Sequence, residues 1–185
     1  MSAHPKDTIT AGTALDLINS NETINNVFVS GKLSLAGLDN FDKEIVVDGC
    51  VFEFFEGASS RFLKLVKLTN SQFILCDFTF TYFLGGLEIE NCVFESYLDF
   101  QSGGHNINGN VFSIRSSTFK KFVNFFDCWY ESAVIIESND FRKGTNLLGK
   151  GIKTTFDVKP KIENNKGKLD IDDEGDVEEK ADFLR

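Results

Sequence analysis

The sequence is poor in several residue types that would indicate particular classes of protein. Its 185 residues include 2 prolines, 1 tryptophan, 1 methionine and 2 histidines. No apolar run approaches the roughly 18 residues of a transmembrane helix, and no apolar segment follows the first residues, so we expect no membrane association and no signal peptide. The 28 acidic side chains outnumber the 19 basic ones. This excess argues against a nucleic-acid partner, because phosphates require cationic contacts.

The few cysteines follow no metal-binding spacing. They stand at Cys50, Cys76, Cys92 and Cys128, and no C-x-x-C motif occurs. With so few histidines, this argues against a zinc site, and we expect no metal and no cofactor. Each cysteine has apolar neighbours, which favours buried reduced thiols over disulfides. Without an export signal, reduced thiols predict a cytoplasmic protein.

Phenylalanine, by contrast, is abundant, with 20 copies, and much of it belongs to an internal repeat. A six-residue phrase that starts with an aliphatic residue and ends in Phe begins at positions 47, 68, 89, 114 and 136, and a degenerate copy begins at Ile162. The intervals between the clear copies are 21, 21, 25 and 22 residues. We attribute the longest interval to a loop insertion in the glycine-rich stretch 103–110. Repeats of this length are typical of solenoids.

Within a repeat, large apolar residues recur every five positions, as in Leu68, Phe73, Phe78 and Phe83. This step fits neither the period of 3.6 of a helix nor the alternation of a long strand. It is typical of a chain that makes a short extended piece, turns and repeats, with large side chains stacked in inward columns. The predicted structural columns are Phe52, Phe73, Phe78, Phe94, Phe119, Phe141, Val47, Leu68, Ile89, Ile114 and Ile136. A small residue stands two positions before each Phe and shares the inward face.

The segments 76–80 (Cys-Asp-Phe-Thr-Phe) and 139–143 (Asn-Asp-Phe-Arg-Lys) match a pattern of a small residue, Asp or Asn, Leu or Phe, and two polar residues. In this the chain resembles the pentapeptide-repeat proteins. The resemblance implies an all-β, right-handed β-helix solenoid, with a short helix before the first coil. Residues 14–18 and 31–35 are the counterparts of that helix and of a first Gly-x-Leu-x-Leu strand. The sequence departs from the family in its coils of 21 or 22 residues.

We therefore predict three regions. Residues 1–12 form a flexible N-terminus, and residues 13–169 form a single β-helix of six or seven coils, with Thr13 as the N-cap of a helical turn or two. Residues 170–185 form an acidic tail. The start of the tail resembles a calcium loop, but Ala181 stands where that loop requires a bidentate Glu, so we interpret the tail as solvated acid.

No catalytic constellation is apparent. A nucleophilic Ser or Cys needs a base within reach. His4 lies near the start of the chain, and we expect His105 to be a solvated loop residue. Most acidic residues of the repeat occupy outward positions. We therefore predict no catalytic residues and no enzymatic activity.

Three functions are left open. The first is a non-catalytic structural or protein-interaction module, with Phe80, Tyr82 and Trp129 as an interaction surface. The second, implied by the family resemblance, is mimicry of DNA that inhibits a topoisomerase. The third is a carbohydrate-binding or carbohydrate-active β-helix, for which Arg115, Lys120 or Lys121 would supply a base. We expect a protein partner or a homodimer through an end coil, and no nucleic acid or membrane.

Overall fold

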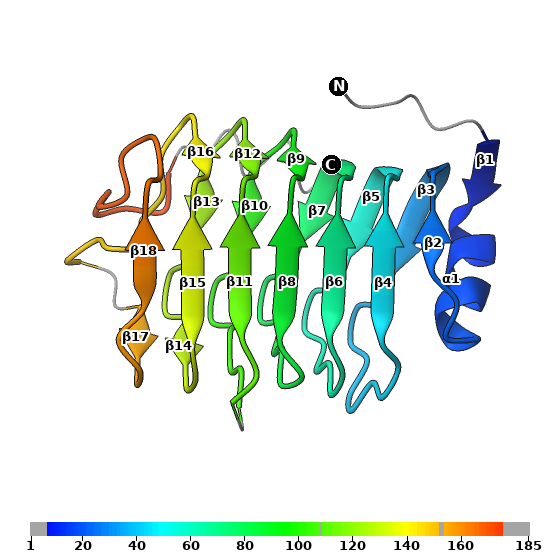
Figure 1. Cartoon of the computed structure of the whole chain (residues 1–185), viewed down its shortest axis with the longest axis horizontal. Helices are drawn as coiled ribbons and strands as arrows, with labels where there is room; N and C mark the ends of the chain where they lie inside the picture. The colour runs from blue at the N-terminus through cyan, green and yellow to red at the C-terminus, as the bar shows by residue number, and fades with distance from the viewer. Residues whose placement is uncertain (1–6, 108, 152–153, 176–185) are drawn as a thin grey trace.

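The computed structural model describes residues 7–107, 109–151 and 154–175, and in it the chain winds into a parallel β-solenoid (Figure 1). Two sheets run along the solenoid. The front sheet has the order β18-β15-β11-β8-β6-β4-β2, so each of its seven strands belongs to one coil. The back sheet has the order β1-β3-β5-β7-β9-β12-β16, with β10 and β13 beside it. The predicted fold class, an all-β solenoid with a short N-terminal helix, is confirmed.

The strands are short, as a chain that turns at every corner requires. The front sheet consists of β2 (Ile24–Asn25), β4 (Ile45–Asp48), β6 (Val66–Thr69), β8 (Leu87–Glu90), β11 (Phe112–Arg115), β15 (Val134–Glu137) and β18 (Lys161–Glu163). The back sheet consists of β1 (Asp7–Thr10), β3 (Val27–Ser34), β5 (Val51–Glu56), β7 (Gln72–Asp77), β9 (Val93–Phe94), β10 (Leu98–Asp99), β12 (Thr118–Phe119), β13 (Val123–Asn124) and β16 (Asp140–Phe141). A third pair joins β14 (Trp129–Tyr130) to β17 (Thr155–Phe156).

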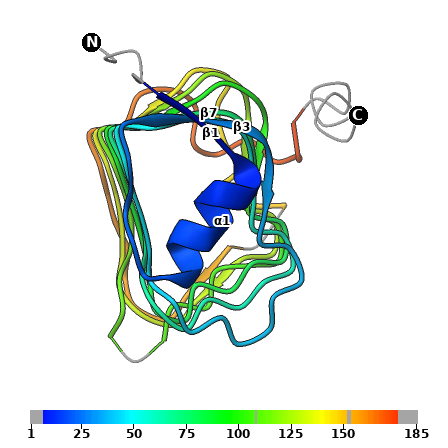
Figure 2. The ribbon, with the colours of Figure 1, turned by 90° about the vertical axis from the view of Figure 1, so that its right-hand side faces the viewer.

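The N-terminal end of the solenoid is covered by the only helix among the described residues, α1 (Ala11–Asn19), which lies across the first coil (Figure 2). Its buried residues are Ala14 and Ile18. The N-cap is Thr10, whose hydroxyl accepts a hydrogen bond from the Thr13 amide at 3.1 Å. The prediction of Thr13 as the cap was therefore wrong, because the helix begins one turn earlier. Residues 7–12 form β1 and the start of α1 rather than a flexible segment.

The predicted column residues all lie in the interior, each at most 1% exposed. One column of rings runs through Phe52, Phe73, Phe94, Phe119 and Phe141. Its successive ring centroids are 5.3, 4.9, 5.0 and 4.8 Å apart, and the planes lie within 11° of parallel. This distance is close to the separation of neighbouring strands, so identical side chains in successive coils stack face over face.

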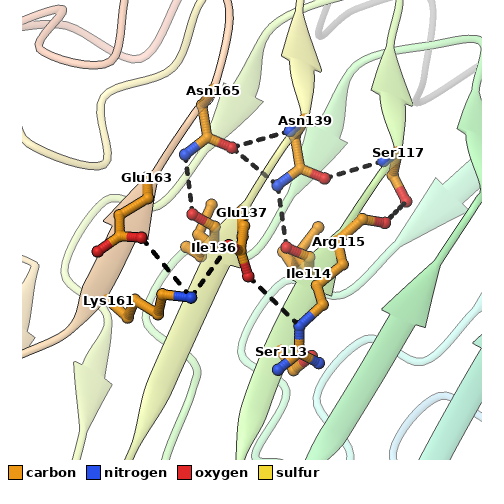
Figure 3. Close-up of polar contacts among 10 residues, drawn as sticks. All are labelled: Ser113, Ile114, Arg115, Ser117, Ile136, Glu137, Asn139, Lys161, Glu163 and Asn165. Atoms are coloured by element: carbon orange, nitrogen blue, oxygen red, sulfur yellow. Dashed lines mark hydrogen bonds and ion pairs between the residues drawn. The ribbon is translucent and has the colours of Figure 1, made fainter.

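The small residues two positions before each ring of this column, together with Asn165 in the last coil, form a polar ladder at the corner between the two sheets. The ladder consists of Cys50, Ser71, Cys92, Ser117, Asn139 and Asn165. Each side chain makes a hydrogen bond to the backbone of a neighbouring coil. The Ser117 backbone amide donates to Asn139 Oδ1 at 2.9 Å, and the Asn139 backbone amide donates to Asn165 Oδ1 at 3.0 Å (Figure 3). The residue before each of the six has a positive φ, which explains the Gly, Asn and Ser found there. The corner therefore requires a small polar residue that follows a turn former.

The irregular repeat length has two structural causes. Phe73 pairs with Phe94 but Asp77 pairs with Asp99, so one residue is inserted in the back sheet. Tyr82 faces Gly104 while Leu87 faces Phe112, so three more residues are inserted before the front sheet. The insertion therefore comprises four residues in total. Our prediction from the sequence placed all four in the loop 103–110, which was wrong for the one that lies in the back sheet.

The inserted residue creates a short outward column, formed by Tyr97, Phe122 and Gly144. The Tyr97 and Phe122 rings lie 6.0 Å apart and both are buried. Residues 169–175, the C-terminal strap, run back along this column. The Tyr97 hydroxyl donates to the carbonyl of Glu174 at 2.9 Å, and Ile171 packs against Gly144. The first residues of the predicted acidic tail thus lie against the solenoid, and residues 176–185 lie outside the described residues.

Candidate aromatic binding surface

A row of aromatic side chains lies on the outer surface of the coils, in the segments that lead from the back sheet to the next strand of the front sheet. Tyr82, His105 and Trp129, the aromatic row, come from three successive coils. The ring centroids of Tyr82 and His105 are 4.2 Å apart, and those of His105 and Trp129 are 5.6 Å apart. Of the predicted interaction residues, the structure therefore brings Tyr82 and Trp129 to the same surface. His105 joins them, a residue that sequence reasoning expected to be a solvated loop residue.

The place of His105 depends on the preceding glycine. Gly104 takes the register position between Tyr82 and Trp129. A Cβ atom on Gly104 would lie 2.6 Å from the carbonyl oxygen of Trp129, so no side chain fits there. His105 follows with a φ of 56°, and its amide donates to the carbonyl of Trp129 at 2.7 Å. The imidazole consequently fills the gap that the glycine leaves in the row.

Carboxylates and one cation hold the rings in place. His105 Nδ1 lies 3.1 Å from Glu131 Oε2, and the His105 side chain is only 23% exposed. The indole Nε1 of Trp129 donates to Asp157 Oδ1 at 3.0 Å. At the other end of the row, the guanidinium of Arg61 lies 5.9 Å from the Tyr82 ring centroid. The row therefore has a defined geometry, although Trp129 remains 44% exposed.

Phe80 lies at the corner just before Tyr82 and is 51% exposed. Its φ is 55°, in the left-handed region that Ser59, Ser102 and Asp127 adopt at the corners of other coils. A large aromatic residue in this conformation costs about 1–2 kcal/mol relative to glycine. Neither the interior packing nor the turn explains an aromatic residue here. Phe80 is thus an exposed ring two residues before Tyr82 in the same coil.

All four cysteines are free thiols buried in the interior. Cys128 lies directly below the row, but its thiol donates to the carbonyl of Phe100 at 3.0 Å. Burial raises the pKa of both Cys92 and Cys128 to about 12. Since the thiolate is the reactive form, these groups are poor nucleophiles at neutral pH. Among the described residues, no three His, Cys, Asp or Glu side chains are arranged to hold a metal ion.

A polar groove of 640 Å³ lies elsewhere, over the outer face of the back sheet. Among the described residues that line it, Glu95 is the only carboxylate, and it pairs with Lys120 at 2.6 Å and accepts a hydrogen bond from Gln72 at 2.7 Å. Hydroxyl and amide side chains make up most of the remaining lining. Paired-carboxylate hydrolysis of a glycoside needs two acids across a cleft. The groove does not bring two acids together.

No helix within the described ranges has the length and apolar character that crossing a membrane would require. Comparisons with models of known protein families, with curated proteins and with solved structures found no match.

Proposed function

We propose that this protein is a non-catalytic interaction module that binds a protein partner through the aromatic row and Phe80. The observation that carries the proposal is the ordered row of outward rings, with Trp129 and Phe80 about half exposed. The solenoid core is filled without these rings, because the coils that carry them already contribute inward side chains such as Phe78, Phe100 and Phe125. Exposed aromatic residues are enriched in binding surfaces, where they contribute large contact areas.

A non-catalytic role is supported by the surroundings of the candidate groups. His105 is engaged by Glu131 and by two rings, and the nearest cysteine, Cys128, points into the interior. A nucleophile beside a free base, which acyl or glycosyl transfer would need, is not assembled on this surface.

Mimicry of DNA is less well supported, because charges on the front sheet are paired across strands. Glu137 lies between Arg115 at 3.9 Å and Lys161 at 3.0 Å (Figure 3), and Lys67 pairs with Glu88 at 3.1 Å. A mimic of the phosphate backbone needs unpaired carboxylates in rows. Sugar stacking along the whole row is also disfavoured, since neighbouring rings are tilted by 46° and 59° and form no flat platform.

We also propose that the chain is an irregular relative of the pentapeptide-repeat proteins. The inward Phe, the small residue two positions before it and the N-terminal helix support this relationship. The inserted residue in the back sheet and the coil length depart from that pattern. Dimerisation through an end coil stays a prediction.

The function is tested by affinity capture with wild-type protein and two variants. In Phe80→Ser/Trp129→Ser the surface loses its exposed rings, and Ile74→Ser removes an exposed apolar residue (40% exposed) from strand β7. We expect partner proteins held by the wild type and by Ile74→Ser to be lost with the double variant, while circular dichroism shows all three folded. Equal capture by all three would refute the aromatic row as the binding surface.

A further inference from the structure

The two ends of the aromatic row differ in a way that indicates the chemistry of the partner. At the Tyr82 end, the molecule supplies its own cation. The Arg61 guanidinium lies 5.9 Å from the Tyr82 centroid and 3.6 Å from Asp39 Oδ1. This end is an internal example of a guanidinium that contacts both a ring and a carboxylate.

The Trp129 end has the ring and the carboxylates, but its register neighbour is small. Thr155, which is exposed, takes the position after Trp129 in the next coil. Around β14 the residues alternate, with Tyr130 buried and Trp129 and Glu131 on the outside. Asp127 is exposed at the corner two residues before Trp129, where its φ is 55°. Asp157 adds a third carboxylate, fixed to the indole N–H at 3.0 Å.

These carboxylates have neutral or titratable partners rather than permanent cations in the described contacts. Asp127 accepts from the Ser102 hydroxyl at 3.4 Å, Asp157 accepts from the indole, and Glu131 contacts His105. Asp157 lies against the indole, Glu131 lies against the neighbouring ring of His105, and Asp127 lies two residues before Trp129. The carboxylates make the potential here negative, and the ring quadrupole is itself negative over the face of the indole. The surface is thus complementary to a cation.

We propose that the Trp129 end of the row, with Asp127, Glu131 and Asp157, binds an arginine side chain of a partner polypeptide. This inference rests on the proposed function and names the chemistry of the segment that docks. Arginine fits better than lysine, because its planar guanidinium stacks on an indole and also donates hydrogen bonds in its plane to carboxylates. The partner's arginine would repeat at Trp129 the contact that Arg61 makes with Tyr82.

Trp129 is the only tryptophan of the chain, so its fluorescence reports directly on this surface. The probe is a blocked pentapeptide of glycine with two arginines, titrated at low ionic strength. The control peptide carries citrulline, which keeps the shape of arginine but lacks its charge. We expect the arginine peptide to change Trp129 emission with an affinity at least about tenfold higher than that of citrulline. Lysine peptide should bind more weakly than arginine peptide.

Two charge-neutralising variants separate a local site from attraction by the net acidic charge. Asp157→Asn keeps an acceptor for the indole N–H and removes one carboxylate beside the ring. Glu22→Gln makes the same charge change in the exposed segment after α1, in the first coil. We expect Asp157→Asn to weaken the arginine peptide by about three- to tenfold, and Glu22→Gln to leave its affinity within about twofold of wild type.

The inference is overturned if arginine and citrulline peptides bind alike, or if both variants weaken binding equally. Its failure is distinguishable from failure of the proposed function. If the peptides show no preference but capture still depends on Phe80 and Trp129, then the binding surface stands and only the cationic partner is wrong.

Discussion

Removal of one ring from the middle of the stacked column is the sharpest test of the fold. Phe119 is fully buried, and its ring lies 5.0 Å from Phe94 and 4.8 Å from Phe141. Phe119→Ala deletes the buried ring and leaves a cavity, which in protein cores costs about 3–5 kcal/mol. The two lost ring stacks belong to that cost, at roughly 0.5–1.5 kcal/mol each. For a domain with a total stability of about 5–15 kcal/mol, the variant is expected to be only marginally folded.

The matched control is Phe80→Ala, the same chemical change at a ring that is 51% exposed. This variant should stay within about 0.5 kcal/mol of wild type, as surface substitutions usually do. Urea unfolding followed by far-ultraviolet circular dichroism and by Trp129 fluorescence measures both variants. With a urea dependence of about 2–3 kcal/mol per molar, the midpoint of Phe119→Ala should fall by roughly 1–2.5 M. Equal midpoints for the two variants would refute the stacked column as the main source of stability.

Three further predictions concern the strap, the thiols and one buried acid. Gly149→Ala places a Cβ atom 2.3 Å from the carbonyl oxygen of Ile171 and should loosen the strap. We expect faster amide hydrogen exchange in residues 169–175. Unchanged exchange rates would contradict the close approach of the strap to Gly149. At pH 8, Cys92 and Cys128, with a pKa of about 12, should form on the order of a thousandfold less thiolate than free cysteine. All four cysteines should therefore react with an aromatic disulfide reagent quickly only after unfolding in urea, and rapid labelling of the native protein would show that the thiols are accessible. Burial raises the pKa of Asp77, so its carboxyl group binds a proton more tightly in the native state than in the unfolded chain. The protonated form therefore contributes stability at low pH. This contribution is lost as the pH rises from the ordinary pKa near 3.9 through the raised native pKa. Asp77→Asn should thus raise the melting temperature at pH 7 but not at pH 3. An equal change in melting temperature at both pH values would show that ionisation of Asp77 is not what destabilises the native state at pH 7.

The column residues could be identified from the sequence because the same local sequence pattern recurs from coil to coil. A small residue after a turn former, followed two positions later by Phe, defines both the corner and the inward direction. Parallel stacking then places equal positions over one another, as in the pairing of Ile114 with Ile136. The polar ladder could be predicted only in part. Its small residues were recognised in the sequence, but the hydrogen bonds of Asn139 and Asn165 to the backbone of neighbouring coils were not.

The candidate surface was predicted in part. Phe80 and Tyr82 stood out because aromatic residues are denser in that segment than the column needs, and Trp129 stood out as the lone tryptophan. His105 was missed as a member, because its position depends on how the insertion shifts the register around Gly104. The strap was missed for a similar reason, since nothing local to residues 169–175 indicates that an inserted residue elsewhere leaves Tyr97 and Phe122 to be covered.

The sequence by itself determined the architecture of this protein, its repeat length and the side chains that fill its interior. These features recur in every coil, so a local pattern is sufficient to specify them. Only the tertiary structure decided which outward residues meet, since outward positions are not constrained by the core. Tyr82, His105 and Trp129 become neighbours through register alone, each from a different coil, and the strap reaches its column by folding back along the solenoid. The aromatic surface is therefore a product of stacking, which converts residues one coil apart in the chain into a continuous row.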